Sequence, residues 1–430
     1  MAANDRSRPY GKISTGAEQL PSLGVQVKRI ERPTKEKEAQ QILADAFQDK
    51  LTVLPCGGGT AMGTGILPET VDMVIDMTGM NRVLAFDPQN LNLAVLGGMT
   101  LDAINEFLAG QGKGFLLPLD PPFSGRATIG GVYAANSSGS LRLRYGTVRD
   151  QALGVRAADA RGREIGFGGK TVKNVSGYDL TKFFVGSAGS LGLITSISFR
   201  VYPLPEAASL CDLIFETVEG LEKFLSALRC SILVPSAVTV TEISPLPAGQ
   251  GPNGPRYRVL TGFEGPGQAI ERQNRDLLRM AQKFGGVVGD VRMGREDMVR
   301  SLRSTVDPEW DTANLLALKI SVPISKGVQT LVLAQKFFKE RRVEARAVLF
   351  PGNGVLFIYA GSVIEADAAR FLAGVKEIGK SAEGFAAPLS GHRNLLAAWG
   401  PRLEPSIHQW ILKPLKEKLD PAGIFPPIIA

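Results

Sequence analysis

The 430 residues are 44% hydrophobic and 21% charged, so the chain can bury a large core and is not mainly disordered. The 49 Lys and Arg against 42 Asp and Glu give a net charge of +7, but the charges are interleaved without a basic stripe, which excludes a nucleic-acid partner. Cys56, Cys211 and Cys230 lie far apart in the sequence, which excludes a disulfide framework and a zinc or iron-sulfur site built from cysteines alone.

Residues 1–28 are polar and without periodicity, which predicts a mobile arm or an arm that docks a partner. No apolar signal segment opens the chain, and there is no run of about 18 apolar residues. We therefore expect a cytoplasmic protein that does not insert into a membrane. Any contact with the inner membrane would be made through partners.

An α+β domain is expected over residues 29–204. A helix is predicted after Thr34 as N-cap, and the run LTVLPC predicts a buried strand that leads into a glycine loop. Two β-rich runs follow, and a second helix is predicted to begin at Thr100 as N-cap and to end at a glycine. Residues 115–204 are rich in glycine and turn signals, which favours a mostly antiparallel sheet.

A second α+β domain is expected over residues 205–395, where strand and helix patterns alternate. The Pro- and Gly-rich loop 244–256 is predicted to be disordered. In the last segment, 396–430, a helix is expected to stop at Pro421 before an apolar tail.

Three consecutive glycines, Gly57 to Gly59, follow the first predicted strand. Glycine can take positive φ, so successive backbone N–H groups can point into one concavity that suits a phosphate or pyrophosphate. The loop is not a P-loop, because Thr64 stands where a lysine is required, and no G-x-G-x-x-G opens a helix as in a Rossmann fold. A tight glycine turn without a ligand remains an open alternative.

Two further segments are rich in small residues. The stretch from Ala127 to Gly139 lets backbone approach a flat ligand closely, or lets one helix pack closely against another element. The stretch from Gly186 to Thr195 passes from glycines into a β-rich run, and an ordinary hairpin with bulges is its alternative interpretation.

The three segments together are more specific than each alone. PCGGGT, ATIGGVYAANSSG and KNVSGYDLTKFFVGSAGSLGLIT, in this order and spacing, resemble the FAD-binding domain of the vanillyl-alcohol oxidase family, the PCMH-type flavoproteins. Residues 144–162 and the ending LKEKLDPAGIFPP resemble the same family. Within it, the third segment is most similar to the smaller FAD-binding subunit of bacterial glycolate oxidase. The resemblance implies an α+β fold, with a two-subdomain PCMH-type FAD-binding domain, an α+β cap domain, and a C-terminal segment that returns to the FAD-binding domain.

The resemblance also implies where FAD would bind. The glycine loop would hold the pyrophosphate, the ATIGG stretch would follow the flavin and ribityl chain, and the third segment would line the adenine or the isoalloxazine. Non-covalent FAD is expected, because no histidine or cysteine stands near the implied flavin position. The implied FAD-binding residues are Pro55, Cys56, Gly57, Gly58, Gly59, Thr60, Pro118, Thr128, Gly130, Gly131, Ala135, Gly139, Gly189, Gly192 and Ile194.

The domain 205–395 would be the cap over the flavin. The pattern H-x-G-D-G-N-x-H, which holds a metal in flavin subunits that oxidise 2-hydroxy acids, is absent, and no metal site is expected. His392 is the candidate proton acceptor, with Arg393 and Lys319 as candidate clamps for a substrate carboxylate. A structural role for His392 and a merely exposed Lys319 are the alternatives. Pro426 stands where the family usually has asparagine.

The function that the resemblance implies is an FAD-dependent oxidoreductase subunit of a 2-hydroxy acid dehydrogenase complex of the glycolate or lactate type. Its partners would be a larger flavin subunit and an iron-sulfur subunit, which would take electrons from the flavin. Two alternatives stay open. One is a stand-alone FAD oxidase or dehydrogenase of another alcohol, and the other is a non-catalytic flavin or scaffold subunit.

Overall fold

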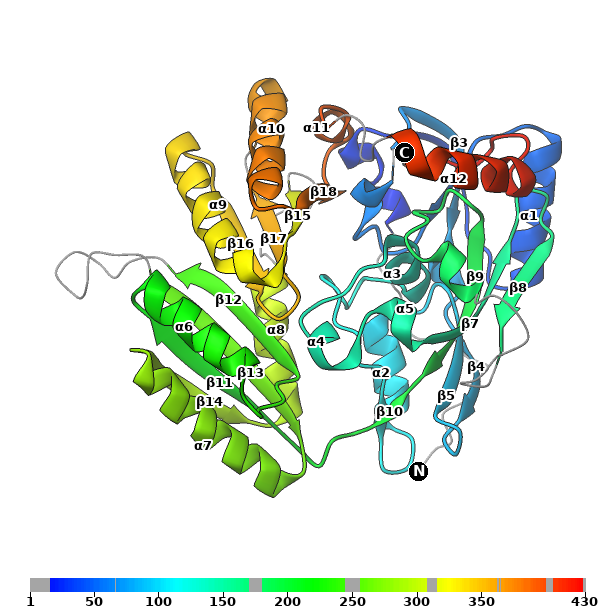
Figure 1. The fold of residues 1–430 in the computed structure, drawn as a ribbon. Coiled ribbons are helices and arrows are strands. Elements are labelled where there is room, and N and C mark those ends of the chain that lie inside the picture. Colours follow the sequence, from blue (N-terminus) through cyan, green and yellow to red (C-terminus); the bar gives the residue numbers. More distant parts are fainter. Residues whose placement is uncertain are drawn as a thin grey trace. The chain divides into compact units, whose positions relative to one another are not determined.

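The computed structural model describes residues 16–65, 67–169, 180–243, 256–307, 315–361, 363, 365–399 and 405–427. The chain divides into two compact units. The first unit contains residues 1–138, 146–204 and 389–430, and the second contains residues 139–145 and 205–388. Helices and strands are mixed in both units (Figure 1), which confirms the predicted α+β class.

The first unit opens with a small parallel sheet. Its strands are β1 (Gln26–Glu31), β2 (Val53–Cys56) and β3 (Thr70–Asp76), in the order β1-β3-β2. Helix α1 (Glu36–Gln48) makes the crossover between β1 and β2, as a parallel arrangement requires. It buries Ala39, Leu43 and Ala46 on one face against the sheet core. The prediction of Thr34 as N-cap was wrong by one residue, since Lys35 takes that position.

A five-stranded antiparallel sheet forms the second part of the first unit, as predicted. Its order is β4-β5-β9-β7-β8. The strands are β4 (Val83–Asp87), β5 (Asn92–Leu96), β7 (Ala152–Ala158), β8 (Glu164–Gly168) and β9 (Leu193–Arg200). A two-residue pair, β6 (Phe115–Leu116) with β10 (Tyr202–Pro203), lies apart from this sheet.

Three helices accompany the five-stranded sheet. They are α2 (Leu101–Ala109), α3 (Ile129–Ala135) and α5 (Val148–Gln151). The predicted N-cap of α2 is confirmed, because the Thr100 hydroxyl accepts a hydrogen bond from the Ala103 N–H. Phe107 of α2, Tyr133 of α3 and Phe199 of β9 are fully buried in one core, which fixes both helices on the sheet.

The N-terminal arm is folded from residue 16 onward, in contrast to the predicted mobile arm. Ala17, Leu20 and Leu23 are buried in two short 3-10 turns, Ala17–Gln19 and Pro21–Leu23. Burial of three apolar side chains stabilises this segment against the body of the unit. Residues 1–15 of the predicted arm lie outside the described residues, as do the predicted disordered loop residues 244–255 and the segment 170–179 of the third motif.

The C-terminal residues belong to the first unit. Helix α11 (Arg393–Ala397) precedes α12 (Pro405–Leu419), and the chain leaves α12 just before Pro421, as predicted. The buried Asp420 carboxylate then accepts hydrogen bonds from the N–H groups of Ile424 and Phe425, at 2.9 Å each. The carbonyl of Ile424 in turn accepts from the Val53 N–H of β2 at 2.7 Å. The tail is therefore tied directly to the strand that leads into the glycine loop.

The second unit contains one eight-stranded sheet in the order β14-β11-β13-β12-β16-β17-β15-β18. Its first half runs β11 (Ala207–Phe215), α6 (Val218–Arg229), β12 (Ala237–Ile243), β13 (Arg256–Gly265), α7 (Gly267–Lys283) and β14 (Val287–Met293). Its second half runs β15 (Leu316–Ser321), α9 (Gly327–Arg341), β16 (Ala345–Phe350), β17 (Val355–Ala360), α10 (Glu365–Ser381) and β18 (Phe385–Ser390). Both halves have the same βαββαβ order and the same strand pairing, so the unit is a structural duplication of a ferredoxin-like fold.

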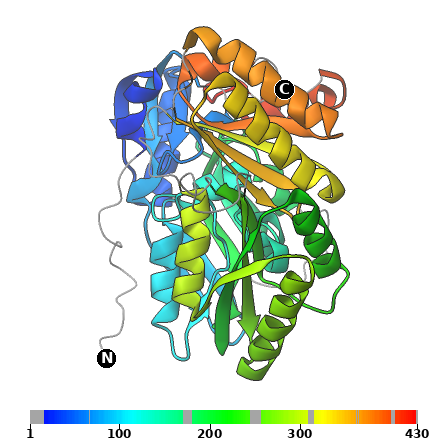
Figure 2. The same cartoon turned by 90° about the vertical axis from the view of Figure 1, so that its left-hand side faces the viewer.

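The helices of the second unit lie on both faces of this sheet. Helices α6 and α7 cover the first half and α9 covers the second, with α10 packed on α9 (Figures 1 and 2). Helix α8 (Arg295–Val306) lies on the opposite face from α7, since its Met298 faces Gly262 whereas Asn274 of α7 accepts from Ser209. The short helix α4 (Arg142–Tyr145) also belongs to this unit, and Tyr145 donates a hydrogen bond to Glu264. No helix within the described residues is long and apolar enough to cross a membrane.

Candidate cofactor-binding site

A cavity in the first unit is lined by all three of the segments singled out in the sequence. The lining comes from the end of β2 and the glycine loop, from Ala127 and α3, and from the turn before β9. Nine glycines contribute to it: Gly57, Gly58, Gly59, Gly65, Gly97, Gly130, Gly131, Gly189 and Gly192. With so few bulky side chains, backbone atoms form much of the wall and can approach a ligand closely.

The glycine loop is held from behind by the folded arm and by one arginine. The Gly16 N–H donates to the Gly57 carbonyl at 2.9 Å, and Arg126 Nη2 donates to the Gly58 carbonyl at 3.1 Å and to the side chain of Gln19. A Cβ on Gly58 would stand 1.7 Å from the Arg126 carbonyl oxygen, so only glycine fits there. Gly59 has φ of 72°, a left-handed value that glycine takes without strain.

Five successive backbone N–H groups in this loop, from Gly57 to Ala61, donate to no acceptor among the described residues. Protein backbone donors of this kind are normally paired, and several of them in one concavity make an anion-binding nest. The carbonyls of Gly57 and Gly58 already accept hydrogen bonds from the arm and from Arg126, whereas the five N–H groups of the loop remain available to a ligand. This arrangement fits a pyrophosphate.

The cavity carries no charged side chain among its described lining residues. Its polar side chains are Cys56, Thr60, Thr64, Thr128 and Ser137. Burial, reinforced by the negative charge of Asp76, raises the pKa of the Cys56 thiol to about 12, so this thiol stays neutral at physiological pH. The backbone N–H dipoles would therefore attract an anionic ligand, and no charged side chain among the described lining residues would repel it.

The second and third segments close the rest of the cavity. The Gly130 N–H donates to the Gly97 carbonyl at 2.7 Å, and this close approach brings α3 against the end of β5. Gly130, Gly131 and Ala135 all line the cavity from α3. A wall of small residues suits a flat, extended ligand such as a flavin and its ribityl chain.

Thirteen of the fifteen FAD-binding residues expected from the sequence line this one cavity. The two others do not. The Pro118 carbonyl accepts from Gln151 Nε2 at 3.5 Å, and Gly139 belongs to the second unit. Sequence reasoning missed Met62, Leu67, Met77 and Gly97, which also line the cavity. It noted Pro426 only as a departure from the family pattern, yet Pro426 is a lining residue.

The three catalytic candidates belong to different units: His392 and Arg393 lie in the first, and Lys319 lies in the second. His392 is the N-cap of α11, where its Nδ1 accepts a hydrogen bond from the Asn394 N–H at 3.3 Å, and its ring packs against Gly24. Arg393 pairs with Glu69 at 3.3 Å. Neither residue lines the cavity, and their contacts account for both as parts of the scaffold of the first unit.

Lys319 lies in the second unit, on β15 opposite Phe357 of β17. Burial, with a further contribution from the nearby Arg142, lowers the pKa of its ammonium group. No described residue forms an ion pair or hydrogen bond with Lys319. The alternative of a merely exposed lysine does not apply, since Lys319 is partly buried.

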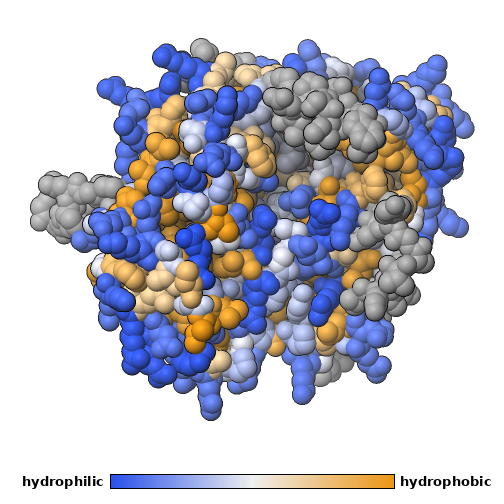
Figure 3. Space-filling model, in the orientation of Figure 1, coloured by the Kyte–Doolittle hydropathy of each residue, from blue (hydrophilic) through white to orange (hydrophobic). Residues whose placement is uncertain are grey.

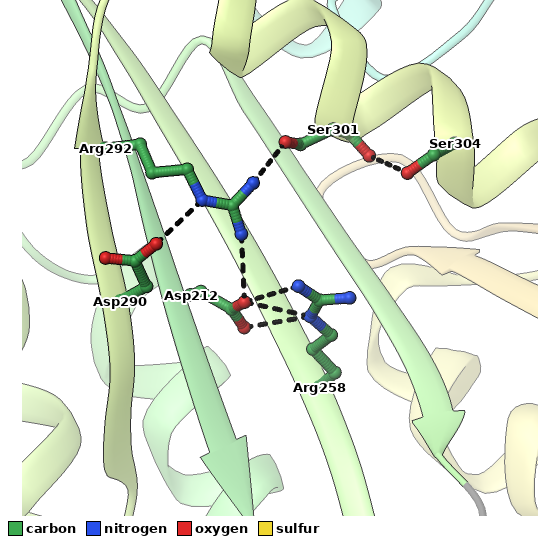
Figure 4. A network of polar contacts seen from close by, with 6 residues as sticks. All are labelled: Asp212, Arg258, Asp290, Arg292, Ser301 and Ser304. Carbon is green, nitrogen blue, oxygen red and sulfur yellow. Dashed lines mark hydrogen bonds and ion pairs between the residues drawn. The ribbon is translucent and has the colours of Figure 1, made fainter.

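Two arginines elsewhere on the same sheet, Arg258 and Arg292, are paired with carboxylates, unlike Lys319 (Figure 4). Arg258 Nε donates to both carboxylate oxygens of Asp212 at 3.0 Å, and this hydrogen bonding raises the pKa of Arg258. Arg292 Nε donates to Asp290 at 2.8 Å, and its Nη1 donates to the Ser301 hydroxyl of α8 at 2.6 Å. This network joins β11, β13, β14 and α8, and its charges already have partners.

The amide-lined cavity of the first unit indicates a protein that binds a phosphate-containing cofactor. Residues 27–168 match the family described as FAD binding domain. The chain therefore carries a PCMH-type FAD-binding domain, and the sequence prediction of FAD as cofactor is confirmed.

Two relatives illustrate what the chain is similar to. The chain is 30% identical over 262 residues to the glycolate oxidase subunit GlcD of Bacillus subtilis, an alignment that covers 59% of this chain and 55% of that protein. It is also 30% identical over 289 residues to a D-lactate dehydrogenase of Archaeoglobus fulgidus, which covers 64% and 61% of the two chains. The alignments thus span little more than half of the length of these relatives.

Solved structures share the fold over almost the whole chain. An alkyldihydroxyacetonephosphate synthase superposes with a TM-score of 0.70 at 21% identity, covering 92% of this chain and 76% of the other. A xylooligosaccharide oxidase from Myceliophthora thermophila superposes with a TM-score of 0.68 at 16% identity, covering 94% and 92%. At these identities the likeness concerns the fold alone.

Proposed function

We propose that this chain is an FAD-dependent oxidoreductase subunit that acts on small 2-hydroxy acids of the glycolate or lactate type, in a complex with a larger flavin subunit and an iron-sulfur subunit. The observation that carries the proposal is the amide-lined cavity inside a matched FAD-binding domain. The glycolate oxidase and D-lactate dehydrogenase relatives support the substrate class.

The residues of the first unit would hold FAD without a covalent bond. The loop amides from Gly57 to Ala61 would bind the pyrophosphate, and the small residues of α3 would lie along the flavin. FAD supplies two-electron redox chemistry, which no protein side chain provides. The chain would orient the cofactor, and the negative charge of its pyrophosphate would lie in a cavity whose described lining side chains are uncharged.

Lys319 is the proposed clamp for the substrate carboxylate. A cation that is partly buried and has no carboxylate partner among the described residues is suited to an anionic ligand. We do not assign proton transfer to His392, because its Nδ1 lone pair is already occupied by the Asn394 N–H.

The test begins with the flavin spectrum of the purified chain and its release by acid, which distinguishes non-covalent from covalent FAD. Anaerobic addition of glycolate, D-lactate or D-2-hydroxyglutarate should bleach the flavin band. Lys319→Met should raise the acid concentration for half-bleaching roughly tenfold to a hundredfold, the value of a charged hydrogen bond, without loss of flavin. Lys336→Met, which removes an exposed lysine paired with Glu340, is the matched control.

The outcomes separate the alternatives. A chain that binds no FAD would contradict the proposal. Bleaching by another alcohol, and not by hydroxy acids, would favour the stand-alone oxidase. A flavin that no substrate bleaches, either in the isolated chain or in the native complex, would favour the non-catalytic subunit.

A further inference from the structure

A groove between α6 and α9 results from weak pairing at the centre of the eight-stranded sheet. Strands β12 and β16 pair at only two positions, Val240 with Leu349 and Thr241 with Val348, whereas β12 pairs with β13 at seven. The two repeated halves diverge beyond this short contact and leave a cavity of about 670 Å³ on the face of the sheet that carries α6 and α9. Its apolar wall is formed by Leu143, Leu225, Leu228, Leu233, Val234, Pro235, Val238, Ile324, Val328 and Pro351.

Apolar side chains also lie exposed around this groove, and Figure 3 shows apolar surface in the region of α6 and α9. Ile232 and Val234, in the loop after α6, are 75% and 59% exposed. Ile324 before α9 and Leu333 on α9 are 42% and 45% exposed. These four are more than a third of the eleven large hydrophobic side chains exposed among the described residues. Such clustering is typical of an interaction surface.

The face of α6 that lines the groove carries a pattern that is complementary to itself. It presents Glu222, Ser226 and Arg229, at the spacing i, i+4 and i+7 that places residues on one helix face, above the buried Leu225. Glu222 and Arg229 stand about 10.5 Å apart along the axis, too far to pair within the helix. Neither has a hydrogen-bond or ion-pair partner among the described residues.

We infer that this face is the interface of a homodimer, in which α6 packs antiparallel against α6 of a second copy. A two-fold axis between Leu225 and Ser226 places Glu222 of each copy opposite Arg229 of the other. The two unpaired charges of one helix then form two intermolecular ion pairs, which is the isologous contact that two-fold symmetry requires. The small Ser226 at the axis lets the helices approach closely.

A second copy accounts for the surface better than a small ligand does. A ligand inside the cavity would cover its buried wall but leave Ile232 and Leu333 in water. A helix pair with its flanking loops covers Ile232 and Val234, in the loop after α6 of both copies, and the opposite charges of Glu222 and Arg229 set its direction. This inference is independent of the proposed oxidoreductase function, because all its residues lie in the second unit and outside the FAD cavity.

Sedimentation equilibrium of the flavin-loaded full chain, from about 1 to about 100 µM, tests the inference. A chain of 46.0 kDa should approach twice that mass as concentration rises. Glu222→Arg and Arg229→Glu should each raise the dimer dissociation constant at least about tenfold, because each creates two like-charge contacts. The double variant E222R/R229E restores both pairs in reverse and should return the constant to within about threefold of the original.

Arg300→Glu is the matched control, since Arg300 is an exposed arginine on α8 with its own pairs to Glu296 and Asp297. It should leave the dimer unchanged. The ratio of flavin to protein absorbance checks that every variant is folded, because none of the residues lines the FAD cavity. A monomer at all concentrations would overturn the inference. A dimer that neither single reversal weakens, or that the double reversal fails to restore, would also overturn it.

Discussion

Gly58 shows how one missing side chain fixes the geometry of the cofactor loop. Its α-carbon lies so close to the Arg126 carbonyl that both backbones must move if a Cβ is added. At the same contact, Arg126 Nη2 donates to the Gly58 carbonyl oxygen at 3.1 Å, which holds the loop against this segment. The absence of one atom thus allows the glycine loop to pack directly against the Arg126 backbone.

Gly58→Ala should therefore lower the free energy of unfolding by at least about 2 kcal/mol and weaken FAD binding at least tenfold. Chemical denaturation and FAD titration by flavin fluorescence measure the two effects. Gly169→Ala is the control, because a Cβ there meets no atom within 4 Å, and it should change stability by less than about 0.5 kcal/mol. Equal FAD affinity in the two variants would contradict this role of Gly58.

At this scale the sequence allowed the loop to be predicted but not its support. A glycine run after a buried strand is a local pattern, and a local pattern can be recognised in the sequence alone. Gln19 and Arg126 reach the loop from distant positions, and no local pattern marks such contacts. His392 was selected because histidines can transfer protons, whereas its capping bond depends on a backbone geometry that one residue type does not reveal.

Among the elements, α2 links the antiparallel sheet to the cofactor cavity. Thr100 caps the helix through its hydroxyl, and its backbone forms an isolated β-bridge with Thr128, which lines the cavity. The cap residue is 4% exposed, so its hydrogen bond is shielded from water. Loss of the cap should loosen both the first turn of α2 and the position of Thr128.

Thr100→Ala should cost about 1 kcal/mol of stability and raise the FAD dissociation constant by up to about fivefold. Thr217→Ala is matched to it, because Thr217 caps α6 in the same way from the second unit. That variant should also lose about 1 kcal/mol but keep its FAD affinity. If both variants lose affinity equally, the link through Thr128 is wrong. Thermal unfolding and FAD titration are the measurements.

The duplication of the second unit could not be predicted from its sequence. The alternation of strand and helix patterns indicated an α+β domain, and the structure confirms that class. The repeat, however, preserves only the order of elements and the pairing of strands. Each half fills its hydrophobic core with different side chains. Cores tolerate such replacement when volume and pattern are kept, so the similarity is lost from the sequence before it is lost from the fold.

Across the whole molecule, the first unit is assembled from three separate stretches of chain. The Ile424 carbonyl joins the last stretch to the first, because it accepts from the Val53 N–H at 2.7 Å. Asp420 holds the turn that presents this carbonyl, since its carboxylate accepts from the N–H groups of Ile424 and Phe425 and pairs with Lys416 at 2.7 Å. Asp420→Ala would leave the two buried N–H groups without their acceptor and would remove the carboxylate that pairs with the Lys416 ammonium group.

We expect Asp420→Ala to lose about 2–4 kcal/mol of unfolding free energy and to weaken FAD binding, because the tail carries Pro426 into the cavity wall. Asp49→Ala, at an exposed position after α1, should have almost no effect on either. Denaturation with and without added FAD measures both quantities. An Asp420 variant as stable as the Asp49 variant would show that the tail does not support the site.

The contact between the tail and β2 also bears on the order in which this protein can be made. A ribosome releases the N-terminal part first, at about 5–20 residues per second, so roughly 20 to 70 seconds separate the emergence of Thr60 from that of Pro426. During that interval the glycine loop has neither its neighbour from the tail nor its complete cavity wall. The nascent first unit would thus have part of its core exposed until Pro426 has emerged, and stable capture of FAD would come only after that point.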